Sequence, residues 1–112
     1  MSDVVRCAEI FNPTEEIGPD HLAGIERWFQ RVRKLLTGPA VTSSPGFERQ
    51  MVDVGVKRAV TFYLTGSPQR GISELMIASN DGVRWGITDD QKVAFLAALT
   101  LYAPSLAREL AT

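Results

Sequence analysis

The side chains best suited to covalent or acid–base chemistry are scarce, since the chain has one histidine, His21, and one cysteine, Cys7. Nucleophilic catalysis needs an activated nucleophile beside an oriented base. His21 could act as the base for Cys7 only if the fold brought the two side chains together. We favour the interpretation that His21 lies on the surface, in the first turn of a helix, and that Cys7 is buried and unreactive. A single cysteine also excludes an intrachain disulfide, and the sequence has no Cys/His cluster for zinc.

Two pairs of neighbouring acids, Glu15 with Glu16 and Asp89 with Asp90, are poor candidates for acid–base catalysis. Adjacent residues of a helix point in different directions, and each pair precedes or begins a predicted helix, where acids stabilise the helix dipole. The segment Asn80-Asp81-Gly82 lacks the flanking ligands of a calcium loop, and no glycines have the spacing of a phosphate-binding loop. The sequence therefore predicts no catalytic residues, no metal site and no cofactor.

Basic residues are concentrated in the middle of the chain, although the formal net charge is only −1. Residues 27–70 contain eight basic residues and two acidic ones, whereas residues 1–26 contain six acidic residues and one basic one. Two interpretations stay open, a surface that binds nucleic acid and a set of solvated faces that neutralise each other. The residues that would bind nucleic acid are Arg27, Arg31, Lys34, Arg49, Lys57 and Arg58, with the aromatic residues Phe62 and Tyr63 nearby.

Residues 19–36 carry the clearest secondary-structure signal, because apolar residues recur every three or four positions along one face of a helix. Ile25 and Trp28 lie on that face and are predicted to be buried. Pro19 suits the first position of a helix, where a missing N–H has no consequence. Gly38 is expected to end the helix in a left-handed conformation.

Five further segments predict strands, because they are rich in β-branched and aromatic residues or alternate between apolar and polar residues. Gly55 divides a first hairpin, and Asn80-Asp81-Gly82 supplies the tight turn of a second. Trp85 lies on the face of the last strand that we expect to be buried. The predicted strands are residues 4–11, 47–54, 56–64, 72–79 and 83–87.

A second helix is predicted near the C-terminus, where Thr88 and Gln91 have the spacing of a capping box. It should run to about Ala103. Pro104 then either kinks this helix or begins a short final helix that continues through Leu110.

The order of these elements predicts an α+β fold in a single domain, residues 1–112. A single antiparallel β-sheet of four to five strands would form two consecutive hairpins. The N-terminal amphipathic helix and the apolar C-terminal helix would pack on one face of that sheet. No signal peptide is visible and the most apolar stretch, residues 93–103, is too short to cross a bilayer, so we expect a cytoplasmic protein.

The predicted C-terminal helix is apolar almost all round, because Thr100 is the one clearly polar residue between Val93 and Ala103. A helix packed on a sheet buries only about half of its circumference. We therefore predict that its second face contacts another copy of the chain in a homodimer, unless the first helix and the N-terminal segment already cover that face. The predicted interface residues are Phe95, Leu96, Leu99, Leu101 and Tyr102.

Three functions are compatible with these observations. The favoured one is a non-enzymatic interaction protein, a homodimer that presents its sheet or its basic helix to another macromolecule. The first alternative is a nucleic-acid-binding regulator that uses the basic surface of residues 27–70. The second is a small-ligand-binding protein or an enzyme, with a pocket between sheet and helix that involves His21, Trp28 or Trp85. The scarcity of reactive side chains makes this second alternative the least favoured.

Overall fold

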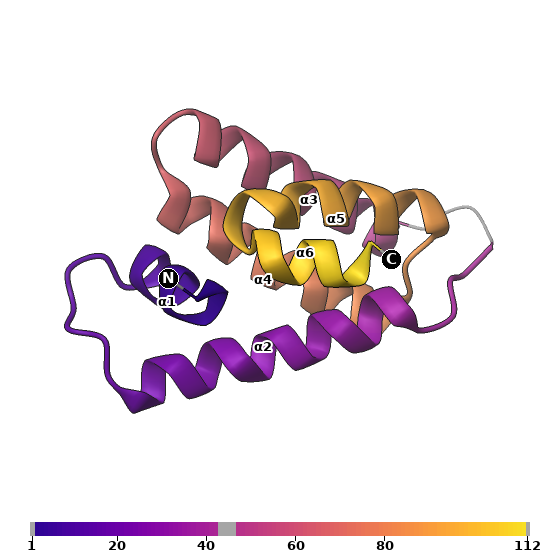
Figure 1. Cartoon of the computed structure of the whole chain (residues 1–112). Coiled ribbons are helices and arrows are strands. Elements are labelled where there is room, and N and C mark those ends of the chain that lie inside the picture. Colours follow the sequence, from indigo (N-terminus) through magenta and orange to yellow (C-terminus); the bar gives the residue numbers. More distant parts are fainter. Residues whose placement is uncertain (1, 43–46, 112) are drawn as a thin grey trace.

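Every regular element in the described part of the chain is an α-helix (Figure 1). The computed structural model describes residues 2–42 and 47–111, with the side chains of residues 2–42 and 50–111. The predicted α+β fold, with its antiparallel sheet of four to five strands, is therefore wrong, because no strand occurs among these residues. The helices are α1 (Asp3–Phe11), α2 (Pro19–Thr37), α3 (Phe47–Leu64), α4 (Pro68–Trp85), α5 (Asp89–Tyr102) and α6 (Pro104–Leu110).

Helix α2 follows its sequence pattern closely. Ile25 and Trp28 are buried, as predicted, and Pro19 lies at the start of the helix. The indole N–H of Trp28 donates a hydrogen bond of 2.9 Å to the hydroxyl of Ser79, which joins α2 to α4. Gly38 follows the helix with φ −80° and an extended backbone, so the predicted left-handed conformation of this glycine is wrong.

Helix α1 replaces the strand predicted over residues 4–11. The hydroxyl of Ser2 accepts a hydrogen bond of 3.2 Å from the backbone N–H of Val5, and Asp3 lies in the first turn, where an acid stabilises the helix dipole. One face of the helix, which includes Cys7, is buried. A capped helix satisfies its backbone hydrogen bonds internally, whereas a strand would need a neighbouring strand, and the described residues supply none.

Helices α3 and α4 replace the hairpins predicted over residues 47–64 and 72–87. The sequence favours strands in residues 47–64 because they are rich in Val, Phe, Tyr and Thr, and in residues 72–87 because Asn80-Asp81-Gly82 has the composition of a tight hairpin turn. In the structure, small residues occupy many of the buried positions, while Val54 and Ile77 are exposed. Tertiary packing of this kind overrides β-propensity. The buried positions are Val52, Gly55, Val56 and Ala59 of α3, and Gly71, Ile72, Leu75, Ala78, Ser79 and Gly82 of α4.

Glycines allow α3 and α4 to approach each other closely along their length. A Cβ atom added to Gly55 would lie 2.9 Å from the Cβ of Ala78, and one added to Gly71 would lie 2.8 Å from the carbonyl oxygen of Ala59. Both distances are shorter than van der Waals contact, so these positions require glycine at this separation of the helices. Gly55, interpreted from sequence as a break between two strands, is thus a packing residue inside a helix.

Trp85 is 42% exposed, so the prediction that it is largely buried is wrong. Strand alternation groups Trp85 with Val83 and Ile87, but residues two apart on a helix point in different directions. Trp85 is the last residue of α4, and the Arg84 guanidinium lies 5.0 Å from the centre of its ring. Gly86 then redirects the chain toward α5 with φ +92°, a conformation that favours glycine.

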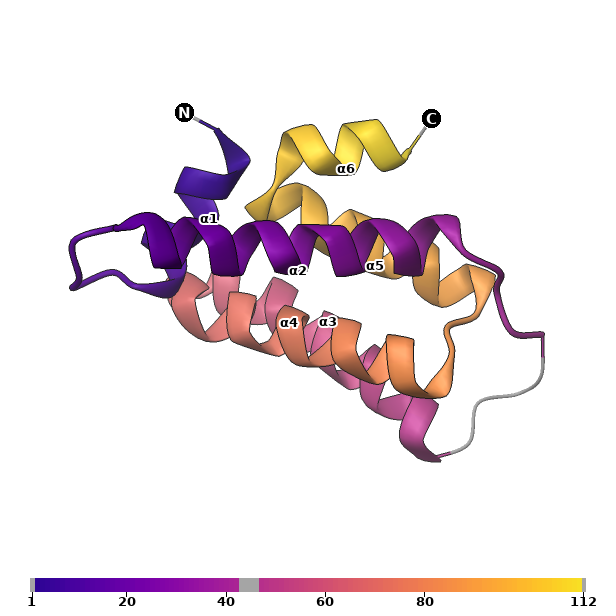
Figure 2. The same cartoon turned by 90° about the horizontal axis from the view of Figure 1, so that it is seen from below.

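The two C-terminal helices agree with the sequence prediction. The hydroxyl of Thr88 accepts a hydrogen bond of 3.1 Å from the N–H of Gln91, whose side-chain oxygen accepts one of 3.0 Å from the N–H of Thr88. Helix α5 ends at Tyr102, and Pro104 begins α6, which ends at Leu110. Helix α6 folds back beside α5 (Figure 2).

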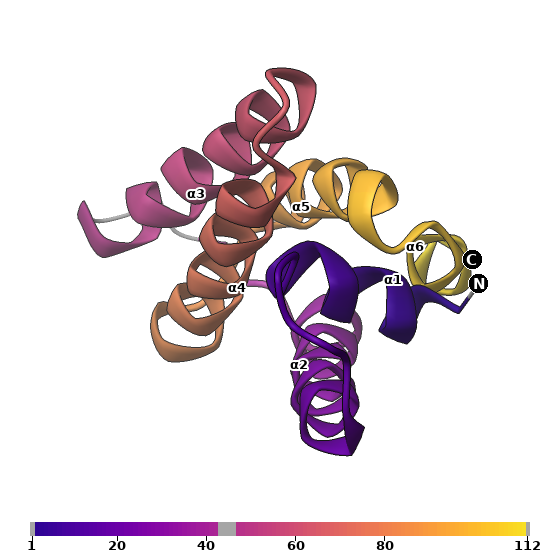
Figure 3. The same ribbon diagram turned by 90° about the vertical axis from the view of Figure 1, so that its left-hand side faces the viewer.

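All the described helices contribute side chains to one hydrophobic core. Helix α4 packs against both α3 and α2, and lies between them, while α5 lies between α3 and α6 (Figure 3). Helix α1 packs against α2 and α4, and it also touches α6. Among the described helices, none combines the length and the apolar character needed to cross a membrane.

The close contact at Gly71 gives a prediction for stability. A Cβ atom added there would lie 1.9 Å from the hydroxyl oxygen of Tyr102. Gly71→Ala should lower the free energy of unfolding by about 1–3 kcal/mol or more, because the core must shift to accept a methyl group. Gly24→Ala is the control, since its Cβ would meet only the Arg27 guanidinium at 3.8 Å, and it should raise stability by about 1 kcal/mol. Urea unfolding measures both, and equal stabilities of the two variants would contradict this packing.

The capping box of α5 gives a second prediction. Thr88→Ala should lower the free energy of unfolding by about 1 kcal/mol, because the N–H of Gln91 loses its acceptor. Thr88→Ser keeps the hydroxyl and should leave stability almost unchanged. Thermal unfolding followed by circular dichroism compares the two variants with the unchanged protein. An equal loss of stability in both would show that the hydroxyl does not cap the helix.

Candidate functional site

Helix α5 turns one side to the core and the other to the surface. Phe95, Leu99 and Tyr102 have no exposed surface, and Gln91 and Ala98 are buried on the same side. The opposite side carries residues at positions i, i+3, i+4 and i+7, which form one stripe along a helix. These residues are Val93, Leu96, Ala97 and Thr100.

The stripe on α5 and the neighbouring surface of α6 form a groove of about 370 Å³. Val93 is 69% exposed, which makes it the most accessible large apolar side chain of this surface. The hydroxyl of Thr100 donates a hydrogen bond of 2.9 Å to the carbonyl oxygen of Leu96, so its proton is bound within the helix. The residues of this α5–α6 groove are Val93, Leu96, Ala97, Thr100, Pro104, Ala107, Arg108 and Ala111.

The outward side of α5 has no charged side chain between Val93 and Leu101. Helix α2, by contrast, exposes basic side chains over much of its outward side. Surface helices of soluble proteins normally carry polar and charged residues on the side that faces water. Contiguous exposed apolar surface typically marks an interaction site, so the α5–α6 groove is the candidate functional site.

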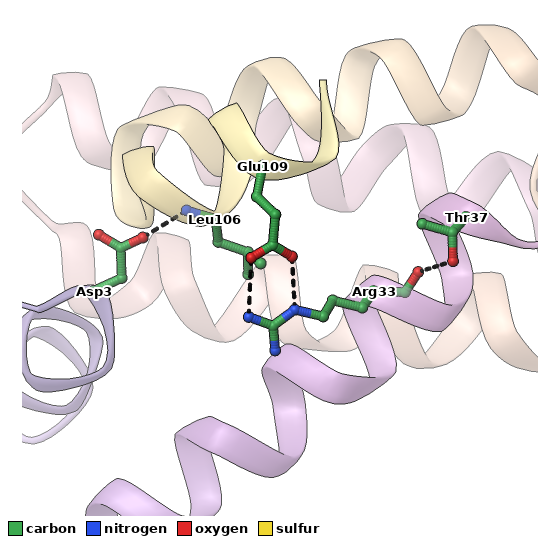
Figure 4. Close-up of polar contacts among 5 residues, drawn as sticks. All are labelled: Asp3, Arg33, Thr37, Leu106 and Glu109. Atoms are coloured by element: carbon green, nitrogen blue, oxygen red, sulfur yellow. Dashed lines mark hydrogen bonds and ion pairs between the residues drawn. The ribbon is translucent and has the colours of Figure 1, made fainter. Parts of the chain in front are cut away.

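Two contacts hold α6 in place and thereby define the groove (Figure 4). Near the start of α6, the backbone N–H of Leu106 donates a hydrogen bond of 2.8 Å to the carboxylate of Asp3 in α1. Near its end, the guanidinium of Arg33 in α2 binds both carboxylate oxygens of Glu109, at 2.9 and 3.5 Å. This hydrogen bonding from Arg33 lowers the pKa of the Glu109 carboxyl. Helix α6 is therefore tied to two other helices as well as to α5.

The residues predicted for the dimer interface divide between the core and the groove. Phe95, Leu99 and Tyr102 belong to the core of the single chain. Leu96 lines the groove, while Leu101 is half-buried and packs against the core. A homodimer that used α5 would therefore make its contacts through Leu96 and the other residues of the groove.

The residues predicted to bind nucleic acid lie on two helices that α4 separates (Figure 3). On α3, Lys57 and Arg58 are exposed, and the guanidinium of Arg58 lies 3.5 Å from the carboxylate of Glu74 in α4. The side chain of Arg49 lies outside the described residues. On α2, the predicted stripe is exposed along the helix and consists of Arg27, Arg31 and Lys34. The structure thus keeps the two basic groups apart rather than joining them in one surface.

His21 and Cys7 each have partners that do not include the other. The Nδ1 atom of His21 accepts a hydrogen bond of 3.0 Å from the N–H of Gly18, and its Nε2 atom lies 2.8 Å from the carboxylate of Glu15. The thiol of Cys7 donates a hydrogen bond of 3.3 Å to the carbonyl oxygen of Tyr102. Neither side chain is therefore arranged as a nucleophile with its base.

Arg6 has a structural role that the sequence pattern did not single out. Its Nε and Nη2 atoms donate hydrogen bonds to the carbonyl oxygens of Tyr102 and Leu101, at 3.2 and 3.0 Å. A basic side chain is favourable at these carbonyls because the C-terminal end of a helix is negative. A single arginine in the acidic segment of residues 1–26 is the one sequence signal that could have suggested this role.

No protein family, curated protein or solved structure matches the chain. A fold alone does not define a function, so the burial, charges and contacts of these residues carry the argument. The α5–α6 groove is the strongest of these observations, because it is apolar, exposed and held in place by contacts to other helices.

The environment of Cys7 gives a prediction for its reactivity. The side chain has no exposed surface, and burial raises the pKa of its thiol to about 12, with Asp3 adding to the rise and Arg6 opposing it. The thiolate is the reactive form, so a raised pKa keeps the thiol unreactive until the pH approaches that value. At about pH 8.5, where a free cysteine is half ionised, iodoacetamide should label the native protein more than about a hundredfold more slowly than the urea-unfolded chain. Equal rates would show that Cys7 is accessible in the native state.

Proposed function

We propose that this chain is a non-enzymatic interaction protein that forms a homodimer through the α5–α6 groove. The observation that carries the proposal is the uncharged outward side of α5 between Val93 and Leu101. Water-exposed apolar surface of this kind is stabilised when a partner covers it. A second copy of the chain is the commonest partner for such a surface, because one twofold axis covers both grooves at once.

The stripe on α5 is complementary to itself in size. In an antiparallel pair of α5 helices, a twofold axis between Leu96 and Ala97 places Leu96 of one copy opposite Ala97 of the other. The same register places Val93 opposite Thr100. Leu96, the largest side chain of the stripe, then faces Ala97, the smallest, and this pairing allows two helices to pack closely. Val93 and Thr100 are alike in size and shape. Ala107 of α6 and Ala111, which follows that helix, leave room at the side of this contact.

The small number of large side chains implies a weak dimer. Val93 and Leu96 are the large apolar residues of the groove, and full burial of such a side chain contributes about 1.5–3 kcal/mol. Two copies would bury four of them, while association costs about 4–15 kcal/mol in lost freedom of motion. We therefore expect a dimer that forms at high protein concentration and dissociates on dilution.

The polar contacts support an interaction role over an enzymatic one. The hydrogen-bonding atoms of Cys7 and His21 are engaged in contacts that hold α1 to α5 and organise the start of α2. In the proposed dimer, the basic stripe of α2 stays exposed and would be the surface presented to another macromolecule. We place the protein in the cytoplasm, since a lone protonated cysteine suits a reducing compartment.

An acidic substitution in the groove tests the homodimer. Ala97 is exposed at the centre of the stripe, so Ala97→Glu introduces a charge that a close contact would have to bury. The unchanged protein should show an apparent mass that rises toward twice that of one chain between micromolar and submillimolar concentrations. Ala97→Glu should weaken the dimer by about tenfold or more. Sedimentation equilibrium measures both dissociation constants.

Gln30→Glu is the matched control, because it adds an acid at an exposed position of α2, outside the groove. It should dimerise as the unchanged protein does, and circular dichroism should show that both variants keep their helices. A monomer over the whole concentration range, or an Ala97→Glu variant that dimerises as well as Gln30→Glu, would exclude the α5–α6 groove as the interface.

A further inference from the structure

A second apolar site lies where α1, α2 and α4 meet. It is a pocket of about 290 Å³ whose surface is mainly apolar. Phe11 of α1, Ile25 of α2 and Met76 of α4 supply its large apolar walls. Ligand pockets in proteins have volumes of about 300–1,000 Å³. This pocket lies at the lower end of that range, so it suits a small molecule and not a large cofactor.

Gly24 gives the pocket its opening along α2. A side chain at this position would meet only the guanidinium of Arg27, whose Nη2 atom would lie 3.8 Å from the added Cβ. The absence of a side chain on Gly24 therefore creates space at the mouth of the pocket, and Arg27 lies at the edge of that space. None of the groove residues on α5 and α6 takes part in this pocket.

Opposite charges lie on the two sides of Gly24. Asp20 precedes it by one turn and lines the pocket, and Arg27 follows it by about one turn, so the three residues share one face of α2. Within the described residues, neither the Asp20 carboxylate nor the Arg27 guanidinium has a hydrogen bond or an ion pair, with each other or with a third group. Both charges are exposed, and both are available to a bound molecule.

The other polar groups at the pocket do not compete for these two charges. Both ring nitrogens of His21 are engaged by Gly18 and Glu15. The side-chain amide nitrogen of Asn12 donates a hydrogen bond of 3.0 Å to the carbonyl oxygen of Ala8. Asp20 thus offers an unpaired anion in the wall of the pocket, and Arg27, which is not itself a lining residue, offers an unpaired cation beside Gly24.

We propose that this pocket binds a free apolar α-amino acid. Its ammonium group would bind the carboxylate of Asp20, its carboxylate would bind the guanidinium of Arg27, and its side chain would lie between Phe11, Ile25 and Met76. Charge-assisted hydrogen bonds at both ends distinguish such a zwitterion from a molecule that has only one of the two groups. This site is separate from the proposed dimer contact, so either can be present without the other.

The test uses the full chain and three amino acids, L-leucine, L-methionine and L-phenylalanine, titrated into isotope-labelled protein and followed by amide chemical shifts. At least one should give saturable shifts at Gly24 and Met76. Isopentylamine and 4-methylpentanoate are the leucine analogues that lack the carboxylate and the ammonium group, respectively. Each should bind about tenfold or more weakly than leucine, because one charge of the protein is left without a partner.

Variants assign the two charges separately. Asp20→Asn should weaken binding of the amino acid and leave that of 4-methylpentanoate unchanged, whereas Arg27→Gln should weaken binding of the amino acid and leave that of isopentylamine unchanged. Gly24→Leu should abolish binding, because the new side chain would occupy the mouth of the pocket, where its Cβ would meet only the Arg27 guanidinium, at 3.8 Å. Circular dichroism and thermal unfolding check that each variant stays folded.

The matched controls are Asp89→Asn, in the first turn of α5, and Arg31→Gln, one turn beyond Arg27 on α2. Both should bind the amino acid as the unchanged protein does. The proposal is overturned if none of the three amino acids shifts the pocket amides, if the analogues bind as tightly as leucine, or if a folded Gly24→Leu variant still binds. Each of these results is independent of whether the chain dimerises.

Discussion

The buried hydroxyl of Tyr102 is the contact on which the position of α5 depends. It donates a hydrogen bond of 2.5 Å to the carbonyl oxygen of Ala59 in α3, and Gly71 of α4 leaves space for it. Burial raises the pKa of Tyr102 to about 12, which keeps the phenol a neutral donor. At the backbone of the same residue, the carbonyl oxygen accepts hydrogen bonds from Cys7 and Arg6 of α1. One residue therefore joins four helices, and a change in its position would disturb all of them.

Fixing Tyr102 also fixes which side of α5 meets the solvent. Leu99 and Phe95 precede it by about one and two turns, so all three side chains enter the core together. Val93 and Ala97 must then point outward, although Ala94, Leu96 and Ala98 beside them are apolar as well. The core has room for one side of this helix only, and the remaining apolar surface becomes the groove beside α6. The proposed interaction site therefore comes from a helical segment, residues 93–102, that is apolar almost all round and buried on one side.

The groove and the amino-acid pocket are built from different helices and differ in their chemistry. The groove of α5 and α6 has apolar walls and one arginine, Arg108, so shape and hydrophobic burial would decide what covers it. The pocket of α1, α2 and α4 has apolar walls below two opposite charges, Asp20 and Arg27, so charge would decide what enters it. Helix α2 connects the two regions, because Arg33 on the same helix holds α6 in place. A dimer contact and a ligand site can therefore coexist on one small chain.

The sequence by itself determined the elements whose signals are local. Pro19 marks the start of α2, and Thr88 with its partner three residues later marks the start of α5, because caps act within one turn. It also showed that residues 93–103 contain more apolar side chains than the core-facing side of a single helix can hold. Only the tertiary structure decided that α3 and α4 are helices. Glycine has a low local preference for helix, but Gly55 and Gly71 allow a neighbouring helix to approach closely, and that packing is visible only in the folded chain. The exposed side of α5 was likewise decided by packing around the last turn of that helix, a contact between residues far apart in the chain.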